Sequence, residues 1–131
     1  MSITATAVEP VKRESFLPTY FKEKLCLGET LIYSFMDKLF EEYSGGYWDF
    51  FTLSNGGFYM APTGYKEITC NADNGFCGEM SGDAAGIVAT LYTLNVIANK
   101  TEQDHFIEMY HLLIDYISFH KESGKIYAAI D

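Results

Sequence analysis

A chain of 131 residues, 48% of them hydrophobic and 16% aromatic, has the length of one domain and is too apolar to be disordered. Its net charge is −9, and this excess lies entirely after residue 30, because basic and acidic residues balance before that point. An acidic body argues against direct binding to nucleic-acid phosphates or to an anionic membrane. The three cysteines (Cys26, Cys70 and Cys77) lack zinc-site spacing, so we expect small buried thiols in a cytoplasmic protein without a secretion signal.

Residues 1–14 are rich in Thr, Ala and Ser and show no hydrophobic period, which predicts a flexible tail before a single domain at residues 15–131. The aromatic start of that domain is expected to dock on its body. An amphipathic helix is predicted from Glu29 to Tyr43. We expect Ser44-Gly45-Gly46 to end it, because glycine readily adopts the left-handed conformation that follows many helices. The apolar face of this helix comprises Ile32, Phe35, Met36, Leu39 and Tyr43.

A β-hairpin is predicted for residues 47–62, with Asn55-Gly56 as a two-residue turn, since both turn positions need a positive φ. This turn would place Leu53 opposite Phe58 and Thr52 opposite Tyr59. Alternation then predicts one face with Trp48, Phe50, Thr52, Tyr59 and Ala61, and another with Tyr47, Asp49, Phe51, Leu53, Phe58 and Met60. Both faces are apolar, so the hairpin is either covered on both sides or covered on one and adhesive on the other.

Two further strands are predicted at residues 65–72 and 76–80, and the short connections favour a small antiparallel sheet of three to four strands. Residues 84–98 carry no charge and are apolar around the whole helical circumference, which predicts a buried core helix with Ser81 as its N-cap. This run is too short and too polar to cross a bilayer.

A last helix is predicted after a capping box formed by Thr101 and Asp104, and it should end at Ser123-Gly124. Ile126 and Ile130 are expected to pack the remaining tail onto the domain. The elements together predict an α+β fold in which a small antiparallel sheet with a central Asn-Gly hairpin packs with about three main helices, one of them buried.

Glu108, His111 and Asp115 have the spacing that brings three polar side chains to one side of a helix, as in metal or acid–base sites. The same helix places its apolar residues on the opposite side, so these three also occupy the normal position of a solvent-exposed face. His105 and His120 lie at the border of the apolar side, where packing or capping is expected. The residue types therefore leave open a metal-dependent hydrolase, a binding module that presents the aromatic hairpin, and a protein without catalytic groups.

Three segments stand in a characteristic order: Tyr43–Pro62 (YSGGYWDFFTLSNGGFYMAP), Asn71 with Asn74-Gly75, and Glu79–Ile87 (EMSGDAAGI). In these segments the chain resembles the ArdB/KlcA antirestriction family of conjugative plasmids and other mobile elements. The resemblance extends over residues 16–131, including the Ile130-Asp131 ending. It implies a cytoplasmic α+β protein that relieves type I restriction of incoming unmodified DNA and is not an enzyme.

The resemblance implies no cofactor and no bound metal, and it points to a protein partner, either the type I restriction complex or an associated host factor. Full imitation of DNA is not expected, because −9 is about half the charge of a duplex of the same length. The polar residues of the resemblance are candidate partner contacts, although each also suits a turn or a cap. They are Ser44, Ser54, Asn55, Asn74, Glu79, Ser81 and Asp131.

Overall fold

The computed structural model describes residues 2–131, which form five strands and five α-helices. The strands are β1 (Ala5–Ala7), β2 (Trp48–Leu53), β3 (Phe58–Pro62), β4 (Ile68–Asn71) and β5 (Cys77–Met80). The helices are α1 (Arg13–Phe21), α2 (Leu25–Leu39), α3 (Gly82–Thr101), α4 (Asp104–Ile117) and α5 (Ser123–Ile130), with short 3₁₀ turns η1 (Pro10–Lys12) and η2 (Lys22–Lys24).

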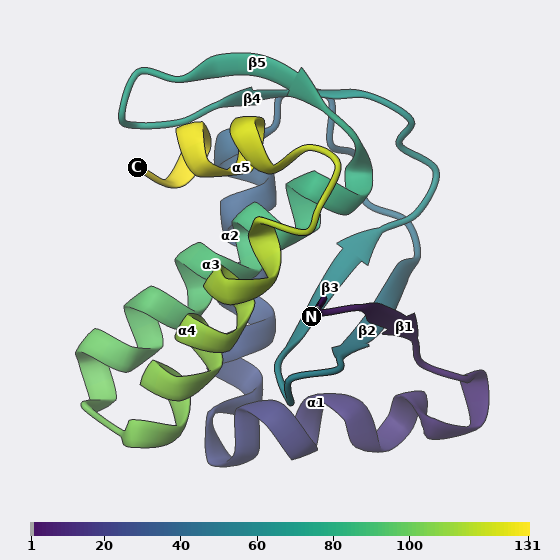
Figure 1. The fold of residues 1–131 in the computed structure, drawn as a ribbon, viewed down its shortest axis with the longest axis vertical. Coiled ribbons are helices and arrows are strands. Elements are labelled where there is room, and N and C mark those ends of the chain that lie inside the picture. Colours follow the sequence, from purple (N-terminus) through teal and green to yellow (C-terminus); the bar gives the residue numbers. More distant parts are fainter. Residues whose placement is uncertain (1) are drawn as a thin grey trace.

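The predicted α+β class is confirmed, and α2, α3 and α4 are the three main helices. Strands β1, β2 and β3 form a three-stranded antiparallel sheet that contains the predicted hairpin. Strands β4 and β5 pair only with each other, so the four predicted strands are divided between two sheets. Figure 1 shows β4 and β5 at the top, above α5, and the three-stranded sheet lower down beside α3.

The segment predicted as a flexible tail contains β1, which pairs antiparallel with β2. The Val8 N–H donates to the Phe50 carbonyl at 2.8 Å, and the Ser54 N–H donates to the Thr4 carbonyl at 2.9 Å. This strand is short, exposed and built from alanine and threonine, so it has no hydrophobic alternation that the sequence could display. The predicted boundary at residue 15 falls inside α1, and a single domain over residues 15–131 stays a prediction.

The hairpin register differs by one residue from the predicted register. Thr52 pairs with Phe58, because the loop has the three residues 54–56 and Gly56 closes it at a φ of +96°. A one-residue shift moves every side chain of a strand to the opposite face, so the predicted faces of β3 were wrong. The observed faces are Trp48, Phe50, Thr52, Phe58, Met60 and Pro62 on one side and Asp49, Phe51, Leu53, Tyr59 and Ala61 on the other.

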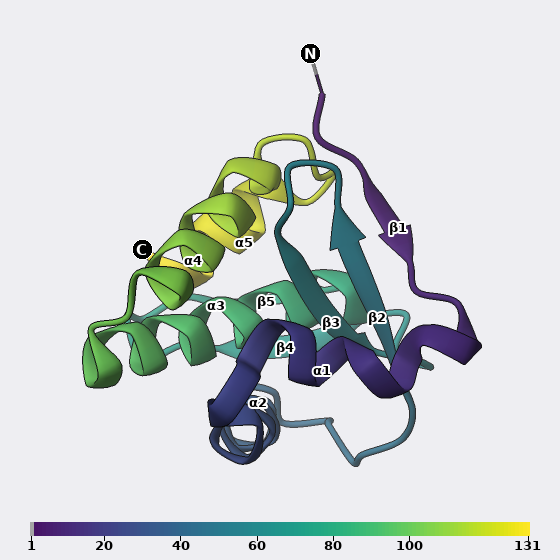
Figure 2. The same cartoon turned by 90° about the horizontal axis from the view of Figure 1, so that it is seen from below.

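Helices cover both faces of this hairpin. On one face α1 contributes Phe16, which stacks on Phe50 at 4.7 Å between ring centroids, and Figure 2 shows α1 lying across the strands. On the other face Tyr116 of α4 stacks on Tyr59 at 6.0 Å. Trp48 is buried as well. The hairpin is therefore part of the core, which contradicts the alternative of an adhesive aromatic surface.

The uncharged stretch forms the buried helix α3, as predicted. Its N-cap is also confirmed, since the Ser81 hydroxyl oxygen accepts a hydrogen bond from the Ala84 N–H at 3.1 Å. The helix runs along the free edge of β3, where the Thr90 hydroxyl lies 3.4 Å from the Met60 backbone. A helix in this position covers the edge hydrogen-bonding groups that would otherwise be open to other chains.

Helix α2 begins and ends four residues earlier than predicted, and Ser44-Gly45-Gly46 lies outside it. Phe40 ends the helix by adopting an extended backbone that forms an isolated bridge with Cys70. The Phe40 side chain is fully buried at this point. Burial of one aromatic side chain therefore decides the helix end, and the glycines belong to the following loop.

The predicted last helix corresponds to α4, which ends at Ile117, before the predicted stop, and the segment predicted as a tail forms the further helix α5. The predicted capping box is absent, because the Thr101 hydroxyl donates to the Ile97 carbonyl at 2.8 Å within α3 and Gln103 precedes α4. The tail packs down as expected, with Ile126 buried and Ile130 half-buried.

The cysteines are all free thiols, but only Cys70 is buried as predicted. Burial, with a smaller contribution from Cys77, raises the pKa of the Cys70 thiol to about 11. Cys26 and Cys77 are exposed, so the expectation of three buried thiols was wrong for these two.

Candidate functional site

The seven predicted contact residues do not form one surface. Ser54 and Asn55 lie at the hairpin tip, and both carry structural hydrogen bonds. The Ser54 hydroxyl oxygen accepts from the Thr4 N–H at 3.0 Å, and the Asn55 side-chain amide donates to the Leu112 carbonyl of α4 at 2.8 Å. The Asn55 amide oxygen also accepts from the Gly57 N–H at 3.0 Å. These two residues hold the loop, rather than facing solvent with free polar groups.

Ser44, Asn74 and Asp131 are exposed but also engaged within the chain. The Ser44 N–H donates to the Tyr65 hydroxyl at 2.9 Å. The Asn74 amide donates to the Ala128 carbonyl at 2.9 Å and to the Asp131 carbonyl at 2.8 Å, which fixes the C-terminal helix under the β4–β5 turn. The side chains of Asp131 and Glu79, another candidate, are exposed and form no hydrogen bond or ion pair with any of residues 2–131.

The Glu108, His111 and Asp115 side chains all lie exposed on the outer face of α4. The apolar side of the helix is buried, as the sequence predicts, through Phe106, Met109, Leu113, Tyr116 and Ile117. No group of three or more His, Cys, Asp or Glu side chains within residues 2–131 has the arrangement of a metal site.

A partly buried polar cluster at the start of α3 was not predicted from the sequence. His120 Nε2 lies 2.7 Å from Asp83 Oδ2, and the Tyr59 hydroxyl donates to Asp83 Oδ1 at 2.8 Å. Glu122 continues the cluster, because its backbone N–H donates to His120 Nδ1 at 3.0 Å and its carboxylate accepts from the Ser81 N–H and hydroxyl at 2.9 and 2.5 Å. We name these five residues the α3 cap cluster.

The hydrogen bonds of the cap cluster determine which proton His120 carries. Its Nδ1 accepts the Glu122 N–H, so the ring proton lies on Nε2, from which it donates to Asp83. Burial, followed by the charge and hydrogen bond of Asp83, raises the pKa of Tyr59 far above its ordinary value. Neither nitrogen of His120 is open to a substrate, and Ser81 is engaged as both cap and donor. The arrangement ties the α4–α5 turn to α3 and β3 and resembles no nucleophile–base pair.

The pKa of Glu122 provides a test of the cap cluster. Burial raises this pKa, but the hydrogen bonds from Ser81 outweigh burial and hold it below its ordinary value. The ionised carboxylate therefore stabilises the fold above its unfolded pKa, and this contribution is lost as the pH falls through the folded pKa.

We expect Glu122→Gln to lower the free energy of unfolding by about 1 kcal/mol at pH 7. Urea unfolding at pH 7 and pH 3 measures this, and the difference from the unsubstituted chain should shrink at pH 3. Glu79→Gln is the matched control, because Glu79 is exposed and unpartnered among the described residues. A Glu122→Gln difference that stays constant across this pH range would contradict the assignment.

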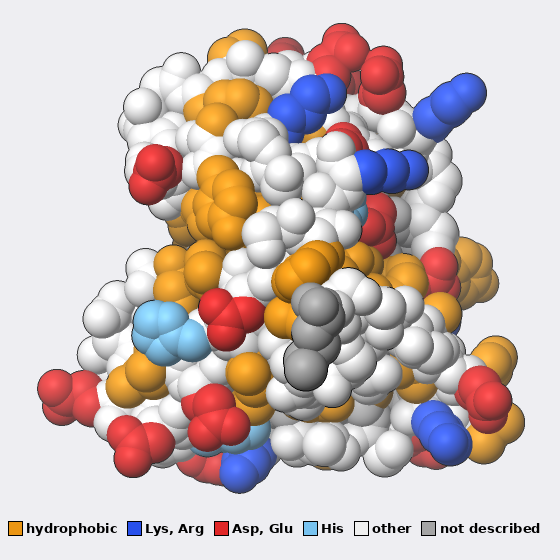
Figure 3. Space-filling model, in the orientation of Figure 1, with side chains coloured by type: hydrophobic (Ala, Val, Ile, Leu, Met, Phe, Trp, Pro, Cys, Tyr) orange, Lys and Arg blue, Asp and Glu red, His pale blue; other side chains and the backbone are white. Residues whose placement is uncertain are grey.

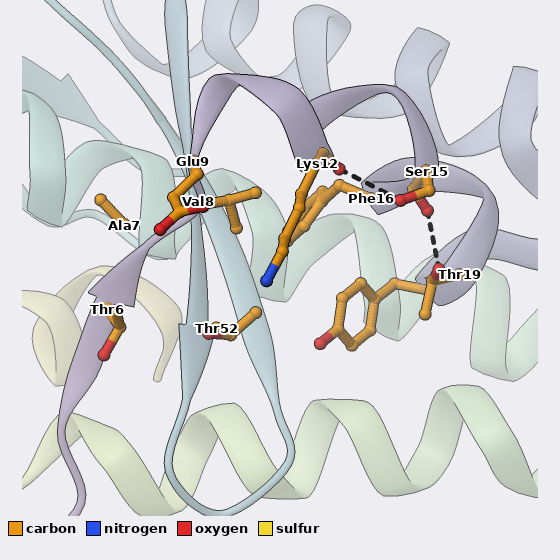
Figure 4. A pocket seen from close by; sticks show the side chains of 10 residues that line it. Thr6, Ala7, Val8, Glu9, Lys12, Ser15, Phe16, Thr19 and Thr52 are labelled. Atoms are coloured by element: carbon orange, nitrogen blue, oxygen red, sulfur yellow. Dashed lines mark hydrogen bonds between the residues drawn. The ribbon is translucent and has the colours of Figure 1, made fainter.

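A hollow of about 330 Å³ lies between β1 and α1. Figure 4 shows the Lys12 side chain reaching across it toward Thr52. The hydroxyl of Ser15 donates to the Lys12 carbonyl at 3.1 Å and that of Thr19 to the Ser15 carbonyl at 2.7 Å, so these two are engaged with backbone. Its lining contains no histidine or cysteine.

Charge is unevenly distributed over the surface. Acidic side chains lie along the exposed face of α4 and the turn before it, at Glu102, Asp104, Glu108 and Asp115. Lysines gather instead near the β4–β5 end, where a hollow of about 280 Å³ is lined by Lys66, Lys121 and Lys125. Figure 3 shows blue side chains at the upper end of the molecule with red side chains beside them, and further red side chains at the lower left.

No helix within the described part of the chain has the length and hydropathy needed to cross a membrane.

Comparison with known proteins relates the chain to antirestriction proteins. The model of the Antirestriction protein family matches residues 41–131. Two antirestriction proteins KlcA of Escherichia coli are 47% and 45% identical, with 98% of this chain and 94% and 95% of the relatives aligned. A solved structure is 45% identical, has a TM-score of 0.86 and aligns over 100% of this chain and 96% of its own.

That structure belongs to work on the KlcA and ArdB proteins, described as showing a novel fold and antirestriction activity against type I DNA restriction systems in vivo but not in vitro. The hairpin, α3, the cap cluster and the lysine hollow all lie inside the segment that the family model matches, whereas nearly all of the hollow between β1 and α1 lies outside it. The chain belongs to the Antirestriction protein family.

Proposed function

We propose that this protein relieves type I restriction of incoming unmodified DNA in the cytoplasm, without catalysis, through contacts with protein. The observation that carries the proposal is the likeness to the KlcA and ArdB structure, at 45% identity and a TM-score of 0.86 over the whole chain. The two KlcA relatives, each aligned over 98% of the chain, carry the same antirestriction description. The partner is the restriction complex or a host factor associated with it.

Charge supports a protein contact rather than full imitation of DNA. A compact chain of this length has a radius of gyration of about 14 Å, which corresponds to roughly 36 Å across. A duplex of that length carries about 20 phosphate charges. The net charge of −9 is about half of that value, and three of the lysines are gathered at one end of the molecule.

The relative's activity in vivo but not in vitro supports a requirement for a component that purified restriction assays lack. A protein that occupied the DNA site of the endonuclease would need no such component. We therefore favour a contact that involves a further cellular protein.

Non-catalytic action predicts that the polar face of α4 is dispensable. The triple variant Glu108→Ala, His111→Ala and Asp115→Ala should fold normally and protect unmodified phage as well as the unsubstituted chain, within about twofold, because surface substitutions cost little. Plating efficiency and circular dichroism measure the two properties. Loss of protection by a folded triple variant, together with metal in the purified protein, would instead support a metal-dependent hydrolase.

Plating tests the function itself. Unmodified phage is plated on a type I-restricting strain with and without the protein, and phage that already carries the host modification serves as the control. We expect the plating efficiency of unmodified phage to rise when the protein is made, whereas that of modified phage stays unchanged. Equal plating of unmodified phage in both strains would overturn the proposal.

A further inference from the structure

The lysine hollow is formed by three separate segments of the chain. Lys66 precedes β4, Lys121 lies in the turn after α4, and Lys125 lies in α5. Residues 31–131 hold only five basic residues, so three of the five surround one hollow of about 280 Å³ in an acidic body.

None of these lysines has a partner in the described part of the chain. The ion pairs there join Arg13 to Asp49 and Lys38 to Asp73, and none of these four residues lines the hollow. The hollow also contains Glu67 and Glu122, but the Glu122 carboxylate is already engaged by the Ser81 N–H and hydroxyl. The lining therefore carries three lysines and two carboxylates, Glu67 and Glu122, which gives it a formal charge of +1 in an otherwise acidic body.

The backbone under the hollow is held in place. The Gly82 N–H donates to the Tyr65 carbonyl at 2.9 Å, and a Cβ on Gly82 would lie only 2.9 Å from that carbonyl oxygen. The Tyr65 hydroxyl in turn donates to the Gly45 carbonyl at 2.8 Å. The cap cluster fixes the turn that carries Lys121. A charged surface on a rigid frame loses less entropy on binding than one on a mobile loop.

We propose that the lysine hollow is the surface through which this protein docks acidic side chains of a protein partner. The inference rests on the proposed function and names the contact surface for it. A protein partner is favoured over nucleic acid because the acidic surface outside the hollow repels a continuous phosphate backbone, whereas a protein can confine its acidic side chains to the hollow. Glu67 within the hollow also repels phosphates, whereas a protein surface can place a basic group opposite it.

Two matched triple variants test this surface. The hollow variant reverses the charge of the three lysines that line the hollow, by Lys66→Glu, Lys121→Glu and Lys125→Glu. The control variant reverses the charge of three lysines elsewhere, by Lys22→Glu, Lys24→Glu and Lys100→Glu. Each substitution adds two negative charges, so both variants change the net charge from −9 to −15. We expect the hollow variant to lose protection of unmodified phage by about tenfold or more, because like charges now face the partner, and the other variant to keep it.

Imitation of DNA predicts the opposite result, since a more acidic protein should protect equally or better.

A third variant with Lys66, Lys121 and Lys125 all changed to Gln avoids new repulsion against Glu122, and circular dichroism checks that each variant folds. Loss of protection by the folded Gln variant supports the proposal as well.

Equal protection by both Glu variants, or equal loss in both, would overturn the proposal while leaving the proposed function intact. Failure of the unsubstituted chain to protect would overturn both. Retardation of a short DNA duplex at physiological salt by the unsubstituted chain, but not by the hollow variant, would reassign the surface to nucleic acid.

Discussion

Gly86→Ala is expected to lower the free energy of unfolding by about 3 kcal/mol, although alanine is normally the better helix former. Gly86 lies in α3 directly against β3, and a Cβ built there would be 2.3 Å from the Met60 carbonyl oxygen and 2.4 Å from Ala61 Cα. Both obstacles are backbone atoms, so no side chain can rotate away. The helix and the strand must separate, in the best-packed part of the core.

Urea unfolding and thermal melting measure this effect, and we expect the melting temperature to fall by roughly 10 °C. Gly124→Ala in α5 is the matched control, because nothing lies within 4 Å of a Cβ at that position. The control should gain about 0.5–1 kcal/mol from helix propensity. A Gly86→Ala variant as stable as the unsubstituted chain would contradict the close contact between α3 and β3.

Asp83→Ala should cost about 3 kcal/mol. Its two carboxylate oxygens accept from the Tyr59 hydroxyl at 2.8 Å and from His120 Nε2 at 2.7 Å, and both partners are buried, at 1% and 8% exposure. Removing the carboxylate leaves two buried donors without an acceptor and also removes a favourable negative charge from the first turn of α3.

Asp73→Ala is the control for Asp83→Ala, since Asp73 pairs with Lys38 at 3.0 Å but both side chains are exposed. Exposed pairs contribute about 0–1 kcal/mol. Asp83→Asn should be intermediate, because its amide oxygen still accepts one hydrogen bond. Urea unfolding at pH 7 compares the three variants, and equal costs for Asp83→Ala and Asp73→Ala would show that the cap cluster does not stabilise the fold.

Hydrophobic periodicity, charge and capping residues predicted those helices whose formation depends on residues near in the sequence. The uncharged run became α3 with its Ser81 cap, and the apolar stripe of α4 is buried as its periodicity indicates. The hairpin was located by its Asn-Gly pair. Its register was missed because the Asn55 side chain binds the Leu112 carbonyl of α4, a contact 57 residues away that favours a longer loop.

The cap cluster could not be predicted either, because it too depends on contacts between residues far apart in the sequence. Asp83 is explained locally as an acidic residue in the first turn of α3, and His120 as a residue at the edge of the apolar side of the predicted last helix. Nothing in the sequence therefore indicates that these two residues, 37 positions apart, form a hydrogen bond. The lysine hollow likewise depends on the β4–β5 sheet folding over α5, which periodicity does not encode. Among the seven predicted contacts, Ser81 lines this hollow, and Glu79 remains an exposed candidate without a partner among the described residues.

We propose that protection depends on the protein being present in the recipient cell and not on a chemical change to the DNA. Unmodified plasmid is prepared from a non-restricting host with and without the protein, and each preparation is transformed into type I-restricting recipients with and without it. We predict efficient transformation only where the recipient makes the protein, whichever host supplied the DNA. DNA from the protein-producing host that transforms every recipient efficiently would contradict the account.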